Sequence, residues 1–187
     1  MHTVRGVRSK LRPLGKRASA RRTPDEAFFV GVSFLLRLLS RGLARLPPSS
    51  RVRRLLVTRR VSRAYAAANR GDFDVVLAGM DLGSYEYRPS RDLLPPDLEP
   101  VFRGREGYLQ LWRYWREAFE DIRWDPEEML DFGDKVVVTT RQSGHGSGSG
   151  VGVSKPVFQV FTLRGGLVIR QEDFLDREEA LEAAARY

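Results

Sequence analysis

The fold is decided by the stretch from Lys135 to Phe174, KVVVTTRQSGHGSGSGVGVSKPVFQVFTLRGGLVIRQEDF. It contains three runs rich in β-branched and aromatic residues, separated by two glycine-rich breaks. Such side chains fit a pleated, half-buried surface better than a helix. We therefore expect strands at Lys135–Thr140, Pro156–Leu163 and Leu167–Phe174. The five glycines between Gly144 and Gly152 predict a wide bend, and Gly165 with Gly166 predicts a tight hairpin turn.

Helical patterns precede these strands. Val52–Asn69 and a segment that begins at Gly104 carry apolar residues at helical spacing. Gly71 is a helix C-terminal signal after the first of them. Asp72 is a candidate N-cap for a short helix over Phe73–Met80.

Two further strands and a last helix complete the order. Tyr85 and Tyr87 alternate with polar residues and predict a short strand, whereas Ile122–Leu130, interrupted by a proline, predicts an edge or bulged strand. Asp176, with Glu179 three positions later, has capping-box spacing for a C-terminal helix. The sequence therefore predicts an α+β fold, in which a cone-shaped, curved antiparallel or mixed sheet is wrapped on one face by about three helices, with a C-terminal helix and a basic N-terminal extension.

The positive charge of the chain is concentrated at its N-terminal end. The 187 residues have a formal net charge of +8. Residues 1–60 contain 16 Lys or Arg against two acidic residues, whereas residues 61–187 contain 16 against 22 acidic residues. Phosphate neutralisation requires a basic face, so an acidic domain argues against a nucleic-acid ligand. We expect a basic extension over residues 1–50 and one cone domain over residues 55–187.

The basic extension has two parts. Residues 1–23 are rich in Arg, Ser and Gly and poor in large apolar residues, which is typical of disordered segments. Residues 26–46 carry apolar side chains at helical spacing with arginines opposite, which predicts an amphipathic helix. The apolar positions are Phe28, Val32, Leu35, Leu36, Leu39, Leu43 and Leu46.

Three interpretations of this helix stay open. It packs on the domain or frays in solution, it lies on an anionic membrane as an interfacial helix, or it is the apolar part of a signal peptide. Asp25 and Glu26 at its start and the lack of a small-residue cleavage site argue against a signal peptide, and the interrupting arginines argue against a membrane span. A translation start downstream of the extension is a further alternative. We expect a cytoplasmic location, with peripheral contact to anionic membrane through residues 26–46 as the membrane-associated alternative.

The chain lacks the residues of a dedicated metal site. It has no cysteine, and its two histidines are His2 and His145. This composition excludes disulfides, thiolate chemistry and a histidine cluster for zinc. No glycine-rich phosphate loop is present either. We therefore expect neither a metal nor a cofactor.

Three groups of residues form motifs that point to a family. The first is Ala64 and Tyr65 with the turn NRGDFD at 69–74, and the second is FRGREG at 102–107. The third is FTLRGG at 161–166, followed by DREEAL at 176–181. Over residues 57–187 the chain resembles the nuclear-transport-factor-2-like superfamily, in its SnoaL-like branch. The resemblance implies a cone with a pocket and no single activity, because this scaffold hosts cyclases, isomerases, epoxide hydrolases, dehydratases and binding modules.

The catalytic residues of the ketosteroid-isomerase relatives are not matched. Where these relatives place a general-base aspartate, near the end of the first strand, this chain has Arg88, and their buried acid corresponds to a position near Gln159. Their helix tyrosine corresponds to Ala64, one residue from Tyr65, which faces about 100° away on a helix. The resemblance therefore implies no ketosteroid-isomerase dyad.

The polyketide-cyclase relatives use an aspartate on the late strands with a histidine nearby, and Asp173 resembles that aspartate. Period-two alternation predicts that one face of the last two strands carries Gln159, Phe161, Gln171 and Asp173. If this face lines the cone, we expect Arg141 and His145 on the first run to line it too. The alternative is that Asp173 pairs with Arg141 across the sheet while His145 is solvated.

The first hypothesis for the function is a pocket of roughly 300 Å³ or more that binds a small apolar or polyketide-like molecule without catalysis. The predicted ligand-binding residues are Tyr65, Tyr85, Tyr87, Trp112, Trp115, Gln159, Phe161 and Gln171. The aromatic stripe at Trp112 and Trp115 is most simply a core face.

The second hypothesis is a cofactor-independent cyclase, isomerase or hydrolase in which Asp173 is the acid and base and Arg141 or His145 stabilises an oxyanion. Burial raises the pKa of an aspartate and a neighbouring arginine lowers it, so these two roles conflict. The third hypothesis is a homodimer formed through the sheet face, which would bury the outward residues of Lys135–Arg170.

Overall fold

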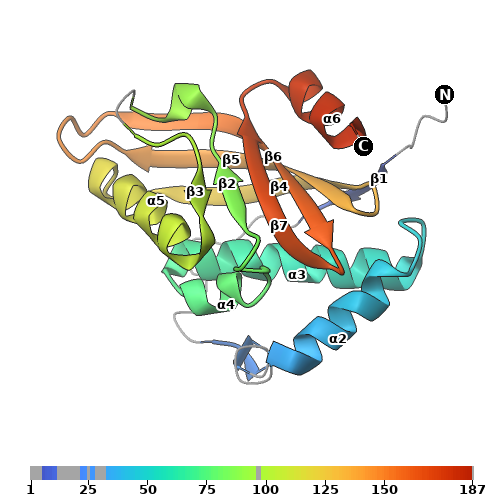
Figure 1. The fold of residues 1–187 in the computed structure, drawn as a ribbon. Coiled ribbons are helices and arrows are strands. Elements are labelled where there is room, and N and C mark those ends of the chain that lie inside the picture. The colour runs from blue at the N-terminus through green and yellow to red at the C-terminus, as the bar shows by residue number, and fades with distance from the viewer. Residues whose placement is uncertain (1–5, 12–21, 25, 28–32, 96–97, 187) are drawn as a thin grey trace.

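The computed structural model describes residues 6–11, 22–24, 26–27, 33–95 and 98–186. These residues form a seven-stranded mixed sheet with helices on both faces (Figure 1). The strands are β1 (Val7–Lys10), β2 (Glu86–Arg88), β3 (Phe102–Arg103), β4 (Arg123–Asp131), β5 (Lys135–His145), β6 (Gly152–Arg164) and β7 (Leu167–Phe174). The helices are α2 (Ser33–Ala44), α3 (Arg51–Arg70), α4 (Phe73–Leu77), α5 (Gly104–Ala118) and α6 (Arg177–Ala185), with a 3₁₀ turn at Arg91–Leu93. The predicted α+β fold is confirmed.

The sheet is built on the three strands that the sequence predicted first. The strand order is β1-β4-β5-β6-β7-β2-β3, and neighbours are antiparallel except for the parallel pair β2 and β7. The predicted tight turn joins β6 to β7, with φ of 58° at Gly165 and 76° at Gly166. Two left-handed residues suit a two-residue hairpin, so glycine is favoured at both. The predicted bulge in β4 lies between Pro126 and Glu128.

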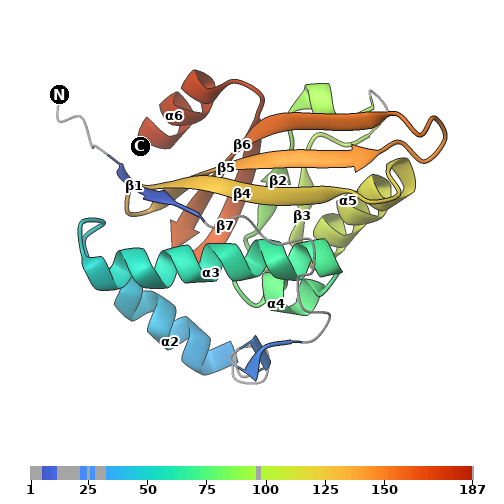
Figure 2. The same ribbon diagram turned by 180° about the vertical axis from the view of Figure 1, so that it is seen from behind.

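The helices cover the two faces of the sheet unequally. The main core packs residues of α3, α4 and α5 against inward side chains of the sheet such as Val136 and Val138. On the opposite face, α6 packs Ala180 and Ala184 against Val137 and Val160. Figures 1 and 2 show α6 on the side of the sheet away from α3 and α2. The helix α6 therefore covers part of the face that the dimer hypothesis assigned to a second subunit.

One strand lies in the segment that we expected to be disordered. Val7–Lys10 forms β1, which pairs with β4, and Arg8 forms an ion pair with Glu128. The next residue, Leu11, is buried in the main core. Composition missed this strand because its backbone partners come from the open edge of β4, far along the chain. Residues 1–5 and 12–21 of the same segment lie outside the described residues.

The helix of the basic extension packs on the domain. Of the predicted helix 26–46, residues 26–27 and 33–46 are described and α2 ends at Ala44, whereas residues 28–32 lie outside the described residues. Arg53 on α3 holds the end of α2: its Nη1 donates to the carbonyl oxygens of Leu43 and Leu46, both at 3.2 Å. The same guanidinium is paired with Asp131 on β4 through Nε–Oδ2 at 2.7 Å and Nη2–Oδ1 at 2.9 Å. Both side chains are about 2 % exposed, so this is a buried ion pair.

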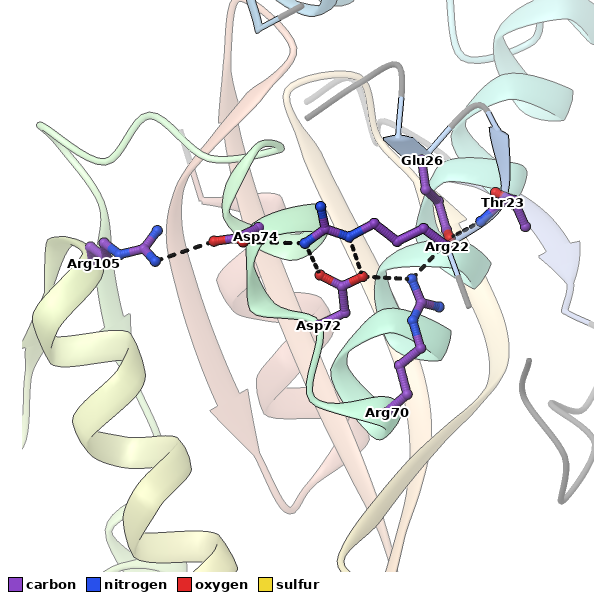
Figure 3. A network of polar contacts seen from close by, with 7 residues as sticks. All are labelled: Arg22, Thr23, Glu26, Arg70, Asp72, Asp74 and Arg105. Atoms are coloured by element: carbon purple, nitrogen blue, oxygen red, sulfur yellow. Dashed lines mark hydrogen bonds and ion pairs between the residues drawn. The ribbon is translucent and has the colours of Figure 1, made fainter. Parts of the chain in front are cut away.

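A second set of polar contacts joins the extension to the turn between α3 and α4 (Figure 3). Arg22 donates to both carboxylate oxygens of Asp72 at 2.7 Å and to Asp74 at 3.2 Å, and Arg70 binds Glu26 at 2.9 Å. Hydrogen bonds from Arg22 are the main reason why the pKa of Asp72 is lowered. Asp72 occupies the predicted N-cap position of α4, but its side chain makes no capping bond to that helix. Its carboxylate is occupied by the arginines instead.

Candidate functional site

Asp173 on β7 lies at the centre of a buried hydrogen-bond network. The hydroxyl of Tyr87 donates to its Oδ2 at 2.6 Å, and the Nε2 atoms of Gln159 and Gln171 donate to its Oδ1 at 2.9 and 3.3 Å. Strand pairing produces this arrangement, because Gln159 is opposite Asp173 and Tyr87 is opposite Gln171. Three side chains from three strands are therefore fixed around one carboxyl group.

Two more tyrosines complete the network. Tyr65 on α3 donates to Oε1 of Gln159 at 2.5 Å, and Tyr85 donates to Oε1 of Gln171 at 3.2 Å. Each glutamine thus accepts a bond from a tyrosine and donates one to Asp173. A polar network in a low-dielectric interior is rigid when its members are satisfied, so the glutamine orientations are set by their neighbours.

Burial dominates the electrostatics of this network. Desolvation raises the pKa of Asp173 to about 6, against the lowering effect of the hydrogen bonds from Tyr87, Gln159 and Gln171. Desolvation also raises the pKa of Tyr65, Tyr85 and Tyr87 well above the usual value. The tyrosines are therefore neutral donors at physiological pH, and Asp173 changes protonation near neutrality.

A cavity of about 150 Å³ lies between the sheet and the helices α3, α4 and α5, with Ser40, Leu43 and Ala44 of α2 along its wall. Most of the wall is apolar, with Val57, Val61, Val76, Met80, Trp112, Trp115, Trp124, Val136, Phe161, Leu163 and Val168. The volume is about half of that expected from the sequence. Two of the indole rings in the wall pack against each other, with the centroids of Trp112 and Trp124 4.7 Å apart.

Seven of the eight predicted ligand-binding residues line this cavity: Tyr65, Tyr87, Trp112, Trp115, Gln159, Phe161 and Gln171. Tyr85 does not line it and bonds to Gln171 instead. Asp173 does not line it either, and lies behind the two glutamines that donate to it. The buried Nε1 of Trp115 has no acceptor among the described residues.

A family model for the SnoaL-like domain matches residues 61–171. The chain belongs to this family. The match runs from the middle of α3 into β7 and includes most of the cavity wall, whereas α2, α6, Arg60 and Asp173 lie outside it. A search of curated proteins gives no match to this SnoaL-like protein.

Solved structures share the fold of this SnoaL-like protein at low sequence identity. TerC, co-crystallised with polyporic acid, is 22% identical, with 66% of this chain and 94% of that chain covered and a TM-score of 0.56. A ketosteroid-isomerase-like protein from Catenulispora acidiphila in complex with trimethylamine is 15% identical, with coverages of 66% and 89% and a TM-score of 0.54. A putative SnoaL-like polyketide cyclase from Jannaschia sp. is 24% identical, with coverages of 69% and 91% and a TM-score of 0.53.

The structure contradicts the expected positions of Arg141 and His145. Arg141 lies on the outward face, with Nε 2.8 Å from Oε1 of Glu127, and His145 Nδ1 lies 3.0 Å from Oδ2 of Asp121. Their side chains are 49 % and 57 % exposed. The β5–β6 register places Val138 opposite Gln159, so the odd-numbered residues of β5 point outward. Because side chains alternate along a strand, an error of one residue in the predicted register moves every side chain of β5 to the opposite face of the sheet.

The alternative pairing of Asp173 with Arg141 is therefore not formed either. Arg88, at the position where the relatives have a general base, is 43 % exposed and pairs with Glu86 at 2.9 Å. Within the described part of the chain, no group of three or more His, Cys, Asp or Glu is arranged to hold a metal ion. The described helices also include none with the length and hydropathy that crossing a membrane requires.

Sequence reasoning missed Arg60 as a residue of the cavity wall. Its Nη1 donates to Gly166 O at 2.8 Å and to Ser40 Oγ at 3.2 Å, and its Nη2 donates to Gly79 O at 2.9 Å. The available signal was its position on the inner face of α3, four residues before Ala64. An arginine within an apolar helical stripe is unusual, because burying a charge is costly.

Proposed function

We propose that this SnoaL-like domain binds a small, largely apolar molecule, about the size of one aromatic ring, in the cavity. The observation that carries the proposal is the make-up of the wall, in which indole rings and aliphatic chains surround a few convergent polar groups. Ligand sites commonly have this composition. An apolar cavity of roughly 150 Å³ in another protein core accommodates benzene, so the volume suits a ligand of that size.

The polar side chains of the wall can orient such a ligand. The hydroxyl oxygens of Tyr65 and Tyr87 retain acceptor capacity, and each of the amides of Gln159 and Gln171 retains a second N–H donor. The indole N–H of Trp115 has no acceptor among the described residues. Relatives of the same fold support a binding role, since TerC was co-crystallised with polyporic acid and the Catenulispora protein is in complex with trimethylamine.

Tryptophan fluorescence can test this proposal, because all three tryptophans of the chain line the cavity. We expect saturable changes on titration with phenol or benzyl alcohol. Ala68→Leu fills the cavity and should weaken binding at least about tenfold, whereas Ala66→Leu, on the same helix but outside the cavity wall, should bind like the wild type. Equal affinities for the wild type and Ala68→Leu would contradict the proposal.

A second candidate function is cofactor-independent acid–base catalysis of the cyclase, isomerase or hydrolase kind. It is favoured by the pKa of Asp173, which burial raises to about 6, near the value that suits a general base. Because Asp173 lies behind the cavity wall, a proton would pass through the hydroxyl of Tyr87, which lines the cavity and is 2.6 Å from Oδ2. Turnover of cyclase-type or isomerase-type substrates by the wild type and Asp173→Asn decides the point, and equal rates would end this candidate.

We further propose that α2 and the start of α3 contact anionic membrane. Leu38, Leu39 and Leu55 are exposed by 46 %, 59 % and 68 %, and the arginines Arg41, Arg45, Arg51 and Arg54 are exposed beside them in the chain. Exposed leucines with arginines suit the interface of an anionic bilayer, where each basic residue contributes about 1 kcal/mol. The full chain should co-sediment with anionic vesicles at low salt and not with zwitterionic ones.

Leu38→Ser combined with Leu39→Ser is the matched variant for this test, because it removes exposed leucines and leaves the buried contacts of Arg53 with the end of α2 intact. Equal co-sedimentation of the variant and the wild type would contradict the membrane proposal. The predicted homodimer through the sheet face also remains a proposal. Light scattering at tens of micromolar, in which a monomer counts against it, tests that proposal separately.

A further inference from the structure

Arg60 is a charged group in the wall of a cavity that is otherwise mainly apolar. Its side chain is partly buried, and desolvation lowers the pKa of Arg60 to about 10. The side chain is therefore still protonated at neutral pH. A buried cation is costly unless an anion or good hydrogen bonds compensate it.

The contacts of Arg60 compensate its charge only in part. Its three acceptors, Gly79 O, Gly166 O and Ser40 Oγ, are all neutral, and no carboxylate of the described residues pairs with it. Two of its five N–H donors, Nε–H and the second on Nη2, donate to none of the described groups. Arg53, which lies on the same helix, differs because both oxygens of the Asp131 carboxylate accept hydrogen bonds from its guanidinium.

We infer that Arg60 binds a carboxylate group of the cavity ligand, so that the ligand class is a small aromatic or aliphatic carboxylic acid. This inference rests on the proposed binding function and narrows it. A carboxylate supplies the negative charge and the acceptors that Arg60 lacks, and charge-assisted hydrogen bonds are stronger than neutral ones. Asp173 is the acidic residue of the buried network beside the cavity, and it lies behind Gln159 and Gln171 rather than beside Arg60.

The arrangement also orients the ligand. Arg60 precedes Tyr65 by five residues on α3, which is a rise of about 7.5 Å along the helix. The carboxylate end of a ligand would lie at Arg60, beside Ser40 of α2, and its apolar end among Trp112 and Trp115. A single ring with one carboxylate satisfies both ends of the cavity.

The test compares two probes of nearly equal shape, benzoate and neutral benzamide, by tryptophan fluorescence and calorimetry on the full chain. Wild type should bind benzoate at least about tenfold more tightly than benzamide, as expected for a charge-assisted contact. In Arg60→Gln the ratio of the two dissociation constants should approach about one, and in Arg60→Lys it should be intermediate because the charge is kept. Arg113→Gln, which removes an exposed arginine of α5 outside the cavity wall, should keep the wild-type ratio.

The outcomes separate the two proposals. If benzamide binds in the cavity as tightly as benzoate, or if Arg60→Gln keeps the preference for benzoate, the inference about Arg60 is wrong while the binding function stands. If neither probe binds, and phenol and benzyl alcohol fail as well, the binding function is wrong and the inference fails with it. Thermal unfolding of each variant shows whether it is folded, and the charge-preserving Arg60→Lys provides the readout if Arg60→Gln does not fold.

Discussion

Replacing Asp173 by asparagine tests the electrostatics of the central network. Asparagine has the shape of aspartate and keeps Oδ1 as the acceptor for Gln159 and Gln171, while its amide nitrogen can donate to the hydroxyl of Tyr87. The substitution therefore keeps the bonds from the two glutamines, reverses the direction of the bond with Tyr87, and removes the ionisation of a buried carboxyl group. We expect a folded variant whose stability depends less on pH.

The magnitude follows from the raised pKa of Asp173. This pKa is about 6 in the folded protein against the ordinary value of 3.8. The folded state binds the proton more tightly than the unfolded chain does. The free energy of unfolding therefore falls as the pH rises from 3.8, the pKa of an ordinary aspartate, to about 6, and this contribution is constant at higher pH. At about 1.36 kcal/mol for each pH unit, the total loss is about 3 kcal/mol, of which about 2 kcal/mol falls between about pH 4.5 and about pH 7.5.

Urea unfolding followed by tryptophan fluorescence at several pH values measures the effect. Asp173→Asn should gain about 2 kcal/mol relative to wild type between about pH 4.5 and about pH 7.5. Asp134→Asn, which removes an exposed carboxylate, should give a curve parallel to that of the wild type. A constant difference between Asp173→Asn and wild type across this range would refute the reasoning, because it would mean that the folded state does not favour the protonated carboxyl group.

Three further substitutions test the buried ion pair, the packing of α2 and the exposed position of Arg141. Arg53→Met should lower the free energy of unfolding by about 3–5 kcal/mol in urea, since it leaves Asp131 buried without its partner, and a loss below about 1 kcal/mol would contradict a buried pair. Gly166→Ala should increase hydrogen exchange in α2, because a Cβ there would clash with the backbone oxygen of Ser40, and unchanged protection of α2 would contradict this packing. Arg141→Ala should change the free energy of unfolding by less than about 1 kcal/mol and leave ligand binding unaltered, because the ion pair of Arg141 is exposed. Weaker ligand binding by this variant would show that Arg141 contributes to the site.

Most helices and strands of the fold could be predicted from short sequence patterns. The β-branched run from Lys135, the Gly165–Gly166 turn and the glycine after α3 each specify backbone conformation within a few residues, and the structure places strands, a hairpin and a helix end there. The same alternation placed Gln159 and Asp173 together on one face. Strands, turns and helix ends of this kind can be predicted from a single sequence, because residues that are close along the chain determine them.

Long-range pairing could not be predicted in the same way. The face on which Arg141 lies depends on the register of β5 against β6, and the flexible composition of the glycine-rich bend does not fix that register. The strand β1 depends on the free edge of β4, and the contact between Arg53 and Asp131 joins residues 78 positions apart. The role of Arg60 likewise follows from three acceptors on separate segments, none of which is near it in the sequence.

Binding of a small apolar ligand in the cavity can be observed directly in a crystal structure after soaking with iodobenzene. The anomalous signal of iodine locates the ligand without reference to any assumed site. We expect one main peak inside the cavity, among Trp112, Trp115 and Gln159, which is lost in Ala68→Leu. Iodine peaks at the surface alone, with none between the sheet and α3, would contradict the claim.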